Sequence, residues 1–221
     1  MKNIFKNNFE GVVRNVAYSE FVHCLVEFCQ NKKFVKTSLQ SVEVIRQSIP
    51  RLAELAEWQQ TAAKVSETTV GTPTTTQGKA ALDEDPNLKF WFPILFGLYE
   101  VVMTCDLEVR TRGLTYLFDT LKTYGSGFPV DFWEVIAKGV LFPIFDDLRL
   151  SRQEHTKYAN REDMSVWMST TLIQAIRHFV DLYSSFFSML RFLTDGLLEI
   201  LSICMTQGTF FFTHSYGSSH H

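Results

Sequence analysis

The sequence predicts an all-α fold, built as a stack of antiparallel helix pairs. Apolar residues recur at steps of three and four along most of the chain, and no strand-like alternation competes before Gly208. Of the 221 residues, 46% are hydrophobic and 20 are phenylalanine, which is ample material for a thickly packed continuous core. Capping residues and glycines separate the periodic stretches at short intervals, as expected for helices that turn back on one another.

The first helical unit is predicted over residues 1–58. One stripe occupies a single helix face at positions i, i+3, i+4 and i+7, namely Phe21, Cys24, Leu25 and Phe28. Thr37 and Gln40 have the spacing of a capping box just before a second stripe, which comprises Leu39, Val42, Ile45, Ile49, Leu52 and Leu55. Because Pro50 falls inside this stripe, the second helix is expected to kink or break there.

Residues 59–88 are predicted to form a flexible, Thr-rich loop. Between Trp58 and Phe90 the sequence has seven threonines and no aromatic residue, followed by an acidic cluster at 83–85. Such a composition buries too little apolar surface to offset the loss of chain entropy on ordering. We interpret the segment as a spacer, with a phosphorylation target as the alternative.

Further helical units are predicted over residues 89–207. Residues 90–104 are almost wholly apolar and suit a buried helix. A second helix is expected to end at residues 124–127 (YGSG), where glycine would supply a left-handed stop. Asp131 and Glu134 have N-cap spacing for a third helix, from Phe132 to about Phe145.

The last predicted elements follow a charged connection. Residues 164–193 are predicted to form one helix about 45 Å long, and its narrow polar stripe comprises Gln174, Arg177, Asp181, Ser184, Ser188 and Arg191. One more amphipathic segment is expected over residues 197–205. Residues 208–221 break the pattern and are predicted to be an unstructured tail.

The segment from Asp106 to Leu114 carries the most informative local pattern. A turn aspartate followed by arginines at a helix start, with small Gly113 allowing close approach of a neighbouring helix, is the layout of the second helix of a HEAT repeat. The fold is therefore predicted to be an α-solenoid of HEAT/armadillo-like pairs. We interpret the arginines as part of a capping ladder between repeats; the alternative is that Arg110 and Arg112 form an exposed partner-binding pair.

No catalytic constellation emerges from the sequence. None of the six histidines has HExxH spacing or pairs with a cysteine or carboxylate at metal-ligand spacing, and the phosphate- and dinucleotide-binding glycine motifs are missing. The aromatic clusters are better explained by core packing than by a ligand pocket. We therefore expect no enzyme activity, no cofactor and no metal.

Charge, apolar run length and cysteine content indicate which partners and which cellular compartment to expect. A formal net charge of −3 gives no reason to expect a nucleic-acid partner. The densest apolar run, residues 90–99, is about half the length that spans a bilayer. Four cysteines without a paired framework favour free thiols in a reducing, cytoplasmic compartment.

The same residues resemble a known family. Residues 91–96 (WFPILF), 106–114 (DLEVRTRGL) and 166–171 (VWMSTT) are similar to the region downstream of the catalytic domain in the large BIG-type Arf guanine nucleotide-exchange factors. Further similarities lie at 21–28 (FVHCLVEF) and 122–125 (KTYG), so that the resemblance covers roughly residues 9–207. The Thr-rich insert favours a fungal member, of which this chain is expected to be a fragment.

The resemblance implies a function that residue patterns alone do not. In this family the region is an α-solenoid that regulates the exchange domain, and its partners are Arf- or Rab-type small GTPases and other domains of the same protein. It also implies a cytoplasmic location peripheral to trans-Golgi membranes, with membrane association through partners. No segment resembles FRLPGE, which carries the glutamate that expels nucleotide in the family, so the chain is expected not to catalyse exchange. The alternative is a generic HEAT-like scaffold or transport adaptor without a GTPase link.

Overall fold

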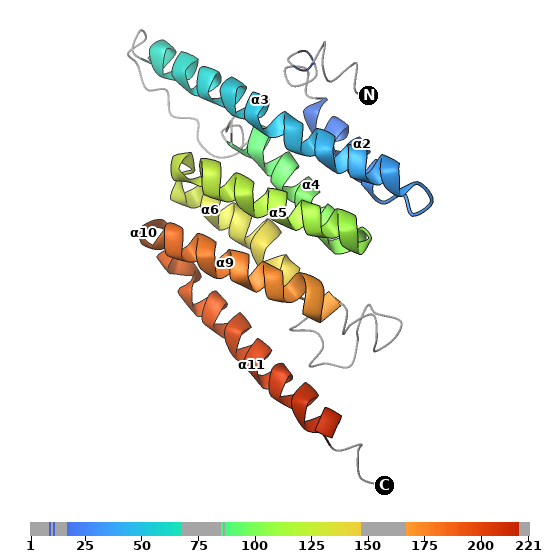
Figure 1. The fold of residues 1–221 in the computed structure, drawn as a ribbon. Helices are drawn as coiled ribbons and strands as arrows, with labels where there is room; N and C mark the ends of the chain where they lie inside the picture. The colour runs from blue at the N-terminus through green and yellow to red at the C-terminus, as the bar shows by residue number, and fades with distance from the viewer. Residues whose placement is uncertain are drawn as a thin grey trace. The chain divides into compact units, whose positions relative to one another are not determined.

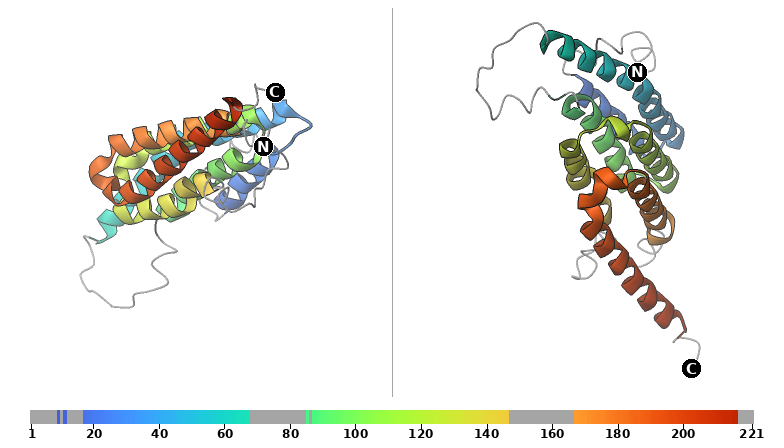
Figure 2. Two further views of the ribbon diagram at one scale, coloured as in Figure 1. Left: turned by 90° about the horizontal axis from the view of Figure 1, so that it is seen from below. Right: turned by 90° about the vertical axis from the view of Figure 1, so that its left-hand side faces the viewer.

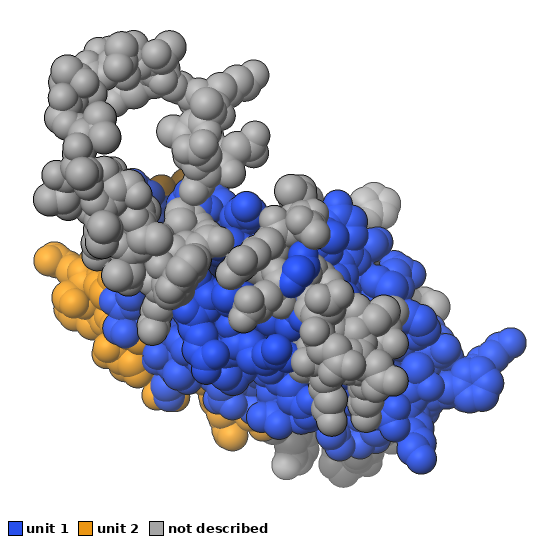
Figure 3. Space-filling model, turned by 90° about the horizontal axis from the view of Figure 1, so that it is seen from above, with its two compact units in different colours: residues 1–132 blue, residues 133–221 orange. Residues whose placement is uncertain are grey.

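The structure is a computed structural model, and it describes Phe9, Gly11, residues 17–67, Asp85, residues 87–146 and residues 167–216. For residues 57–67, 168–169 and 206–216 the description is limited to the backbone. All elements in these ranges are helical, which confirms the predicted all-α class. Contacts divide the chain into two compact units, residues 1–132 and 133–221 (Figure 3).

Unit 1 contains two helix pairs that stack on one another (Figure 1). The first pair is α2 (Tyr18–Cys29) and α3 (Val35–Glu67); the second is α4 (Phe92–Thr104) and α5 (Leu107–Tyr124), preceded by a π-helical turn at Asn87–Trp91. Within the stack, α2 packs on α4 and α3 packs on α5. Because both pairs share one core, the division into compact units falls after residue 132.

Two glycines allow the helices of unit 1 to approach closely. A Cβ atom at Gly113 of α5 would lie 2.7 Å from Val101 Cγ1 of α4, and one at Gly97 of α4 would lie 2.6 Å from Val22 Cγ1 of α2. Both distances are shorter than any stable contact, so only glycine fits at these crossings. The role predicted for Gly113 is confirmed.

Unit 2 is built around an aromatic core. It takes in the end of α6 (Val130–Ile136), a π-helical turn (Ala137–Leu141) and a 3₁₀ turn (Phe142–Phe145), then a π-helical turn (Met168–Leu172) that leads into α9 (Ile173–Ser185). The elements α10 (Phe187–Leu190), a 3₁₀ turn (Arg191–Leu193) and α11 (Thr194–Tyr216) complete it (Figure 2). Phe179 is fully buried between Phe142 and Phe145, with ring centroids 6.1 and 5.8 Å away.

Several predicted boundaries need correction. The helix expected to span residues 164–193 is broken: Phe186 leaves the helical conformation (φ −119°, ψ 31°) between α9 and α10. Tyr183 and Thr194 form a 2.6 Å hydroxyl hydrogen bond across the break. The chain then continues as α11 through position 208 to Tyr216, so that part of the tail expected to be unstructured is helical; residues 217–221 lie outside the described residues.

Two expected stop signals act differently in the structure. Helix α3 runs without interruption through Pro50 to Glu67, and so extends into the segment predicted as a loop. The rest of that loop, residues 68–84 and 86, lies outside the described residues. Gly125 ends α5 with right-handed dihedrals (φ −62°, ψ −22°) and enters a 3₁₀ turn, Gly125–Gly127, so the left-handed stop is wrong.

Candidate functional site: a recess between α3 and α5

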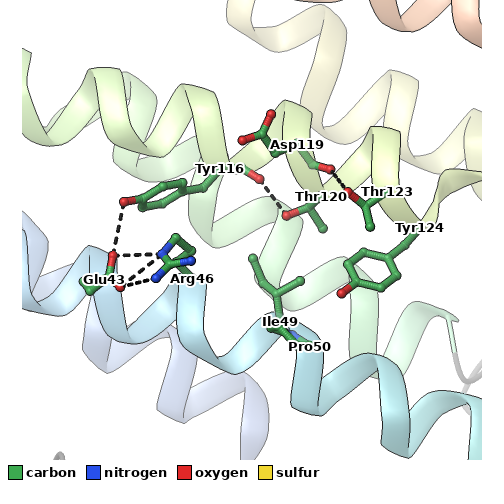
Figure 4. A pocket seen from close by; sticks show the side chains of 9 residues that line it. All are labelled: Glu43, Arg46, Ile49, Pro50, Tyr116, Asp119, Thr120, Thr123 and Tyr124. Carbon is green, nitrogen blue, oxygen red and sulfur yellow. Dashed lines mark hydrogen bonds and ion pairs between the residues drawn. The ribbon is translucent and has the colours of Figure 1, made fainter.

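A recess of about 500 Å³ opens between α3 and α5 in unit 1 (Figure 4). The α3 wall comes from positions 43, 46 and 50, which are separated by three and four residues and therefore share one helix face. The α5 wall comes from positions 116, 120, 123 and 124 for the same reason. The full lining is Glu43, Arg46, Ile49, Pro50, Tyr116, Asp119, Thr120, Thr123 and Tyr124.

One end of the recess is closed by a charged cluster centred on Glu43. Its carboxylate accepts hydrogen bonds from Arg46 Nε at 2.9 and 3.1 Å and from Gln47 Nε2 at 2.9 Å. The Tyr116 hydroxyl donates to the same carboxylate at 3.2 Å, and the Arg46 guanidinium carbon lies 5.8 Å from the Tyr116 ring centroid. This cluster links α3 to α5 through residues 73 positions apart in sequence.

These contacts fix the protonation states of the cluster. Hydrogen bonding from Arg46 is the main cause that lowers the pKa of Glu43 to about 2, and burial opposes the shift. Burial, followed by the neighbouring Glu43 charge, raises the pKa of Tyr116. Near neutral pH Glu43 is therefore ionised and Tyr116 is protonated, an arrangement that suits a fixed recognition surface better than proton transfer.

Two threonine hydroxyls that line the recess bond to carbonyls of their own helix. Thr120 Oγ1 donates to the Tyr116 carbonyl at 2.6 Å, and Thr123 Oγ1 donates to the Asp119 carbonyl at 2.7 Å. Asp119 is exposed at the rim. Besides these threonines, the recess presents the apolar residues Ile49 and Pro50, the ring of Tyr116 and the carboxylate of Asp119. A mixture of apolar, aromatic and charged groups is typical of protein-binding sites.

Tyr124 also lines a smaller adjoining cavity of about 80 Å³. Its ring centroid lies 4.9 Å from that of Trp91, and Ala53 and Ala56 of α3 leave the space open. Asn87 contributes a buried Oδ1 that has no hydrogen-bond partner, while its Nδ2 donates to Asp85 at 3.0 Å. The cavity can therefore accept a small group with a hydrogen-bond donor, including water.

The two arginines named from sequence lie apart. Arg112 is exposed, forms a 3.1 Å ion pair with Glu108 and sits one turn before Tyr116, where its positive charge counteracts the rise in the Tyr116 pKa. Arg110 is half-buried near Cys105, and its Nε is buried without a hydrogen-bond partner. Positions two residues apart on a helix point to opposite sides, so the structure gives no exposed pair. Arg112 alone is near the recess.

This recess could not be predicted from the sequence. Glu43 and Arg46 have ion-pair spacing on a helix, but their link to Tyr116 depends on tertiary packing. Among the described residues no cluster of three or more histidine, cysteine or carboxylate side chains is placed to hold a metal. No helix in the same part of the chain is both long and apolar enough to cross a membrane.

Comparison with known proteins identifies relatives of the chain. The chain is 38% identical over 207 residues to the ADP-ribosylation factor guanine nucleotide-exchange factor SEC7 of Saccharomyces cerevisiae, covering 93% of this chain and 10% of that protein. It is 28% identical over 205 residues to the human Brefeldin A-inhibited guanine nucleotide-exchange protein 1, with 92% and 10% covered. The chain is homologous to a segment of the large Arf guanine nucleotide-exchange factors. This confirms the predicted resemblance.

The homology to these exchange factors extends along nearly the whole chain but covers little of each relative. A shorter match, 34% identical over 121 residues, links it to the factor sec71 of Schizosaccharomyces pombe, with 54% of this chain and 7% of that protein covered. The chain thus spans about a tenth of the length of the first two relatives. No protein-family model and no solved structure matches the chain.

Proposed function

We propose that the chain is a non-catalytic regulatory and partner-binding segment of a trans-Golgi Arf guanine nucleotide-exchange factor, acting in the control of Arf activation and vesicle traffic. The observation that carries the proposal is the alignment of 93% of the chain with an exchange factor ten times its length. No residues of this chain resemble the FRLPGE exchange segment, which favours regulation over exchange chemistry.

The recess between α3 and α5 is the surface that we assign to this role. Its walls are rigid because Glu43, Arg46 and Tyr116 hold one another across the two helices. A preorganised wall loses little side-chain entropy when a partner docks, and tyrosine and arginine are the residue types that most often dominate binding energy at interfaces. The proposed partners are Arf- or Rab-type GTPases and other domains of the same exchange factor.

The test is capture of the full 221-residue chain by immobilised Arf- and Rab-type GTPases locked in the GTP or GDP state. Circular dichroism establishes that the chain is helical before each experiment. We expect one class of GTPase to retain the chain in a nucleotide-dependent manner. We also expect Asp119→Lys and Arg112→Glu, at and beside the recess, to weaken retention about tenfold or more.

Asp195→Lys is a matched control because it reverses an exposed charge on α11, in unit 2. It should leave capture unchanged. A folded chain that none of the GTPases retains would refute the GTPase partner and favour docking onto other domains or a general scaffold role. Equal losses for the recess variants and the control would refute the assignment to the recess.

A further inference from the structure

The chain turns from α2 into α3 at a corner at one end of unit 1 (Figure 1). Large apolar side chains are exposed at this corner. Phe34 is 64% exposed, Val35 is 46% exposed, and Phe28 at the end of α2 is 41% exposed. Single exposed apolar residues are common, but three within eight positions at one corner form a patch. A patch of this kind marks an interaction surface.

The same corner is basic. Lys32, Lys33 and Lys36 are all exposed, and residues 28–42 contain no aspartate or glutamate. Lys36 lies in the first turn of α3, where the helix dipole disfavours a positive charge and no acidic residue compensates it. Lys36 is therefore unfavourable for the stability of α3, which is consistent with a role in binding a partner.

The backbone of the corner is held in place while these side chains point outward. Asn31 Oδ1 accepts hydrogen bonds from the amides of Lys33 and Phe34 at 3.0 and 3.1 Å. Ser38 Oγ donates to the Asn31 carbonyl at 2.9 Å. The apolar and basic groups are thus presented by a preformed turn, which lowers the entropy cost of binding.

The neighbouring corner between α4 and α5 lies at the same end of unit 1. Helices α3 and α5 run in the same direction, because Glu43 contacts Tyr116 and the recess continues from Ile49 to Tyr124. This second corner adds Leu107, which is 43% exposed, and the exposed carboxylate of Asp106. Glu108 is neutralised by Arg112, and Asp106 offsets one of the three lysines of the first corner. The combined end face is therefore apolar at its tips and positive overall.

We propose that this end of unit 1 binds directly to a membrane surface that carries anionic lipids. Phe34 and Val35 would enter the headgroup region, and the three lysines would contact lipid phosphates and carboxylates. A lipid surface fits better than a protein partner because the apolar groups stand on a projecting turn flanked by lysines. The proposal does not depend on GTPase binding at the recess.

The test is co-sedimentation of the full chain with phosphatidylcholine vesicles, alone or with roughly 30 mol% phosphatidylserine. We expect binding to the anionic vesicles only, weakening as salt rises. Each lysine near an anionic surface is worth about fivefold in affinity, so K32Q/K33Q/K36Q should bind about 100-fold more weakly. Phe34→Ser keeps every charge and should bind about tenfold more weakly.

The control is K89Q/K122Q, which removes two positive charges just before α4 and at the end of α5, at the other end of unit 1, and should bind like the parent chain. None of the four corner side chains makes a hydrogen bond or ion pair with other described residues, so the corner variants should retain the parent circular dichroism and melting curve. A folded parent chain that does not co-sediment with anionic vesicles would overturn the proposal. Equal losses in corner and control variants would overturn it too, and normal binding by Phe34→Ser would refute insertion.

Discussion

Replacing Gly113 with alanine tests whether the close crossing of α4 and α5 holds unit 1 together. In an isolated helix the change would be favourable by up to about 1 kcal/mol, because alanine restricts the unfolded chain and suits a helix. In the structure the new methyl group would lie 2.7 Å from Val101 Cγ1 and 3.3 Å from Val101 Cβ. The methyl group meets a buried β-branched side chain that has little freedom to move.

The two effects oppose each other, and their magnitudes decide the sign. Overpacking a well-filled core costs about 1–3 kcal/mol. A 2.7 Å contact with a β-branched side chain places the cost at about 2–3 kcal/mol, so after the propensity gain Gly113→Ala should lower the free energy of unfolding by about 1–2 kcal/mol. Gly127→Ala is the matched control, because a Cβ there meets no atom within 4 Å. That variant should be neutral or slightly more stable. Urea unfolding followed by circular dichroism measures both.

A second substitution shows whether the clash is the cause. Val101→Ala alone should cost about 2 kcal/mol by leaving a cavity. When it is combined with Gly113→Ala, the new methyl group occupies part of the vacated space. The double variant should therefore lose about 1 kcal/mol less free energy of unfolding than the two single variants lose together. A Gly113→Ala variant as stable as the parent chain, or strictly additive losses, would refute the argument.

Further predictions concern the recess, the thiols and the core of unit 2. Because the pKa of Glu43 is lowered to about 2, its contribution to stability is fully present above about pH 4.5 and is lost as the pH falls towards 2. The pair is partly exposed, so Glu43→Gln should lose only about 1 kcal/mol at neutral pH, and pH-dependent melting should show the difference vanish near pH 2. Burial is the main cause that raises the pKa of Cys29 to about 12 and that of Cys105 to about 11, so a thiol reagent should label both slowly until urea unfolds the chain, whereas half-buried Cys24 should react first. Phe179→Ala should cost about 3–5 kcal/mol, measured by urea unfolding, and a loss below 1 kcal/mol would show that the aromatic core of unit 2 is not formed as described.

Local pattern was sufficient to predict the helical class and the positions of several helices. The stripe around Val42 became α3, and the layout from Asp106 to Gly113 became the start of α5. These features depend on residues within two turns of one another, so sequence reports them directly. The stripe beginning at Phe21 lies in α2, but it is not the buried face of that helix: Phe28 is 41% exposed, and the buried residues are Tyr18, Val22, Leu25, Val26 and Cys29.

The errors occurred where tertiary contacts or solvent outweighed a local signal. Pro50 is on the exposed side of α3, where the carbonyl that loses its amide partner can bond to water, and the helix continues. Phe186 breaks the long predicted helix without any glycine or proline signal, while its ring lies 5.7 Å from that of Trp133. A break stabilised by packing against a residue 53 positions away is not encoded in local periodicity.

The two proposed binding surfaces of unit 1 depend on different residues. The recess depends on the hydrogen bonds that Glu43, Arg46 and Tyr116 make with one another across α3 and α5. The α2–α3 corner depends on exposed lysines and on Phe34, which make none of these contacts. Variants of one surface should therefore leave binding at the other intact. If corner variants abolished nucleotide-dependent capture in the absence of lipid, a single shared surface would explain both activities and the assignment of the recess would be wrong.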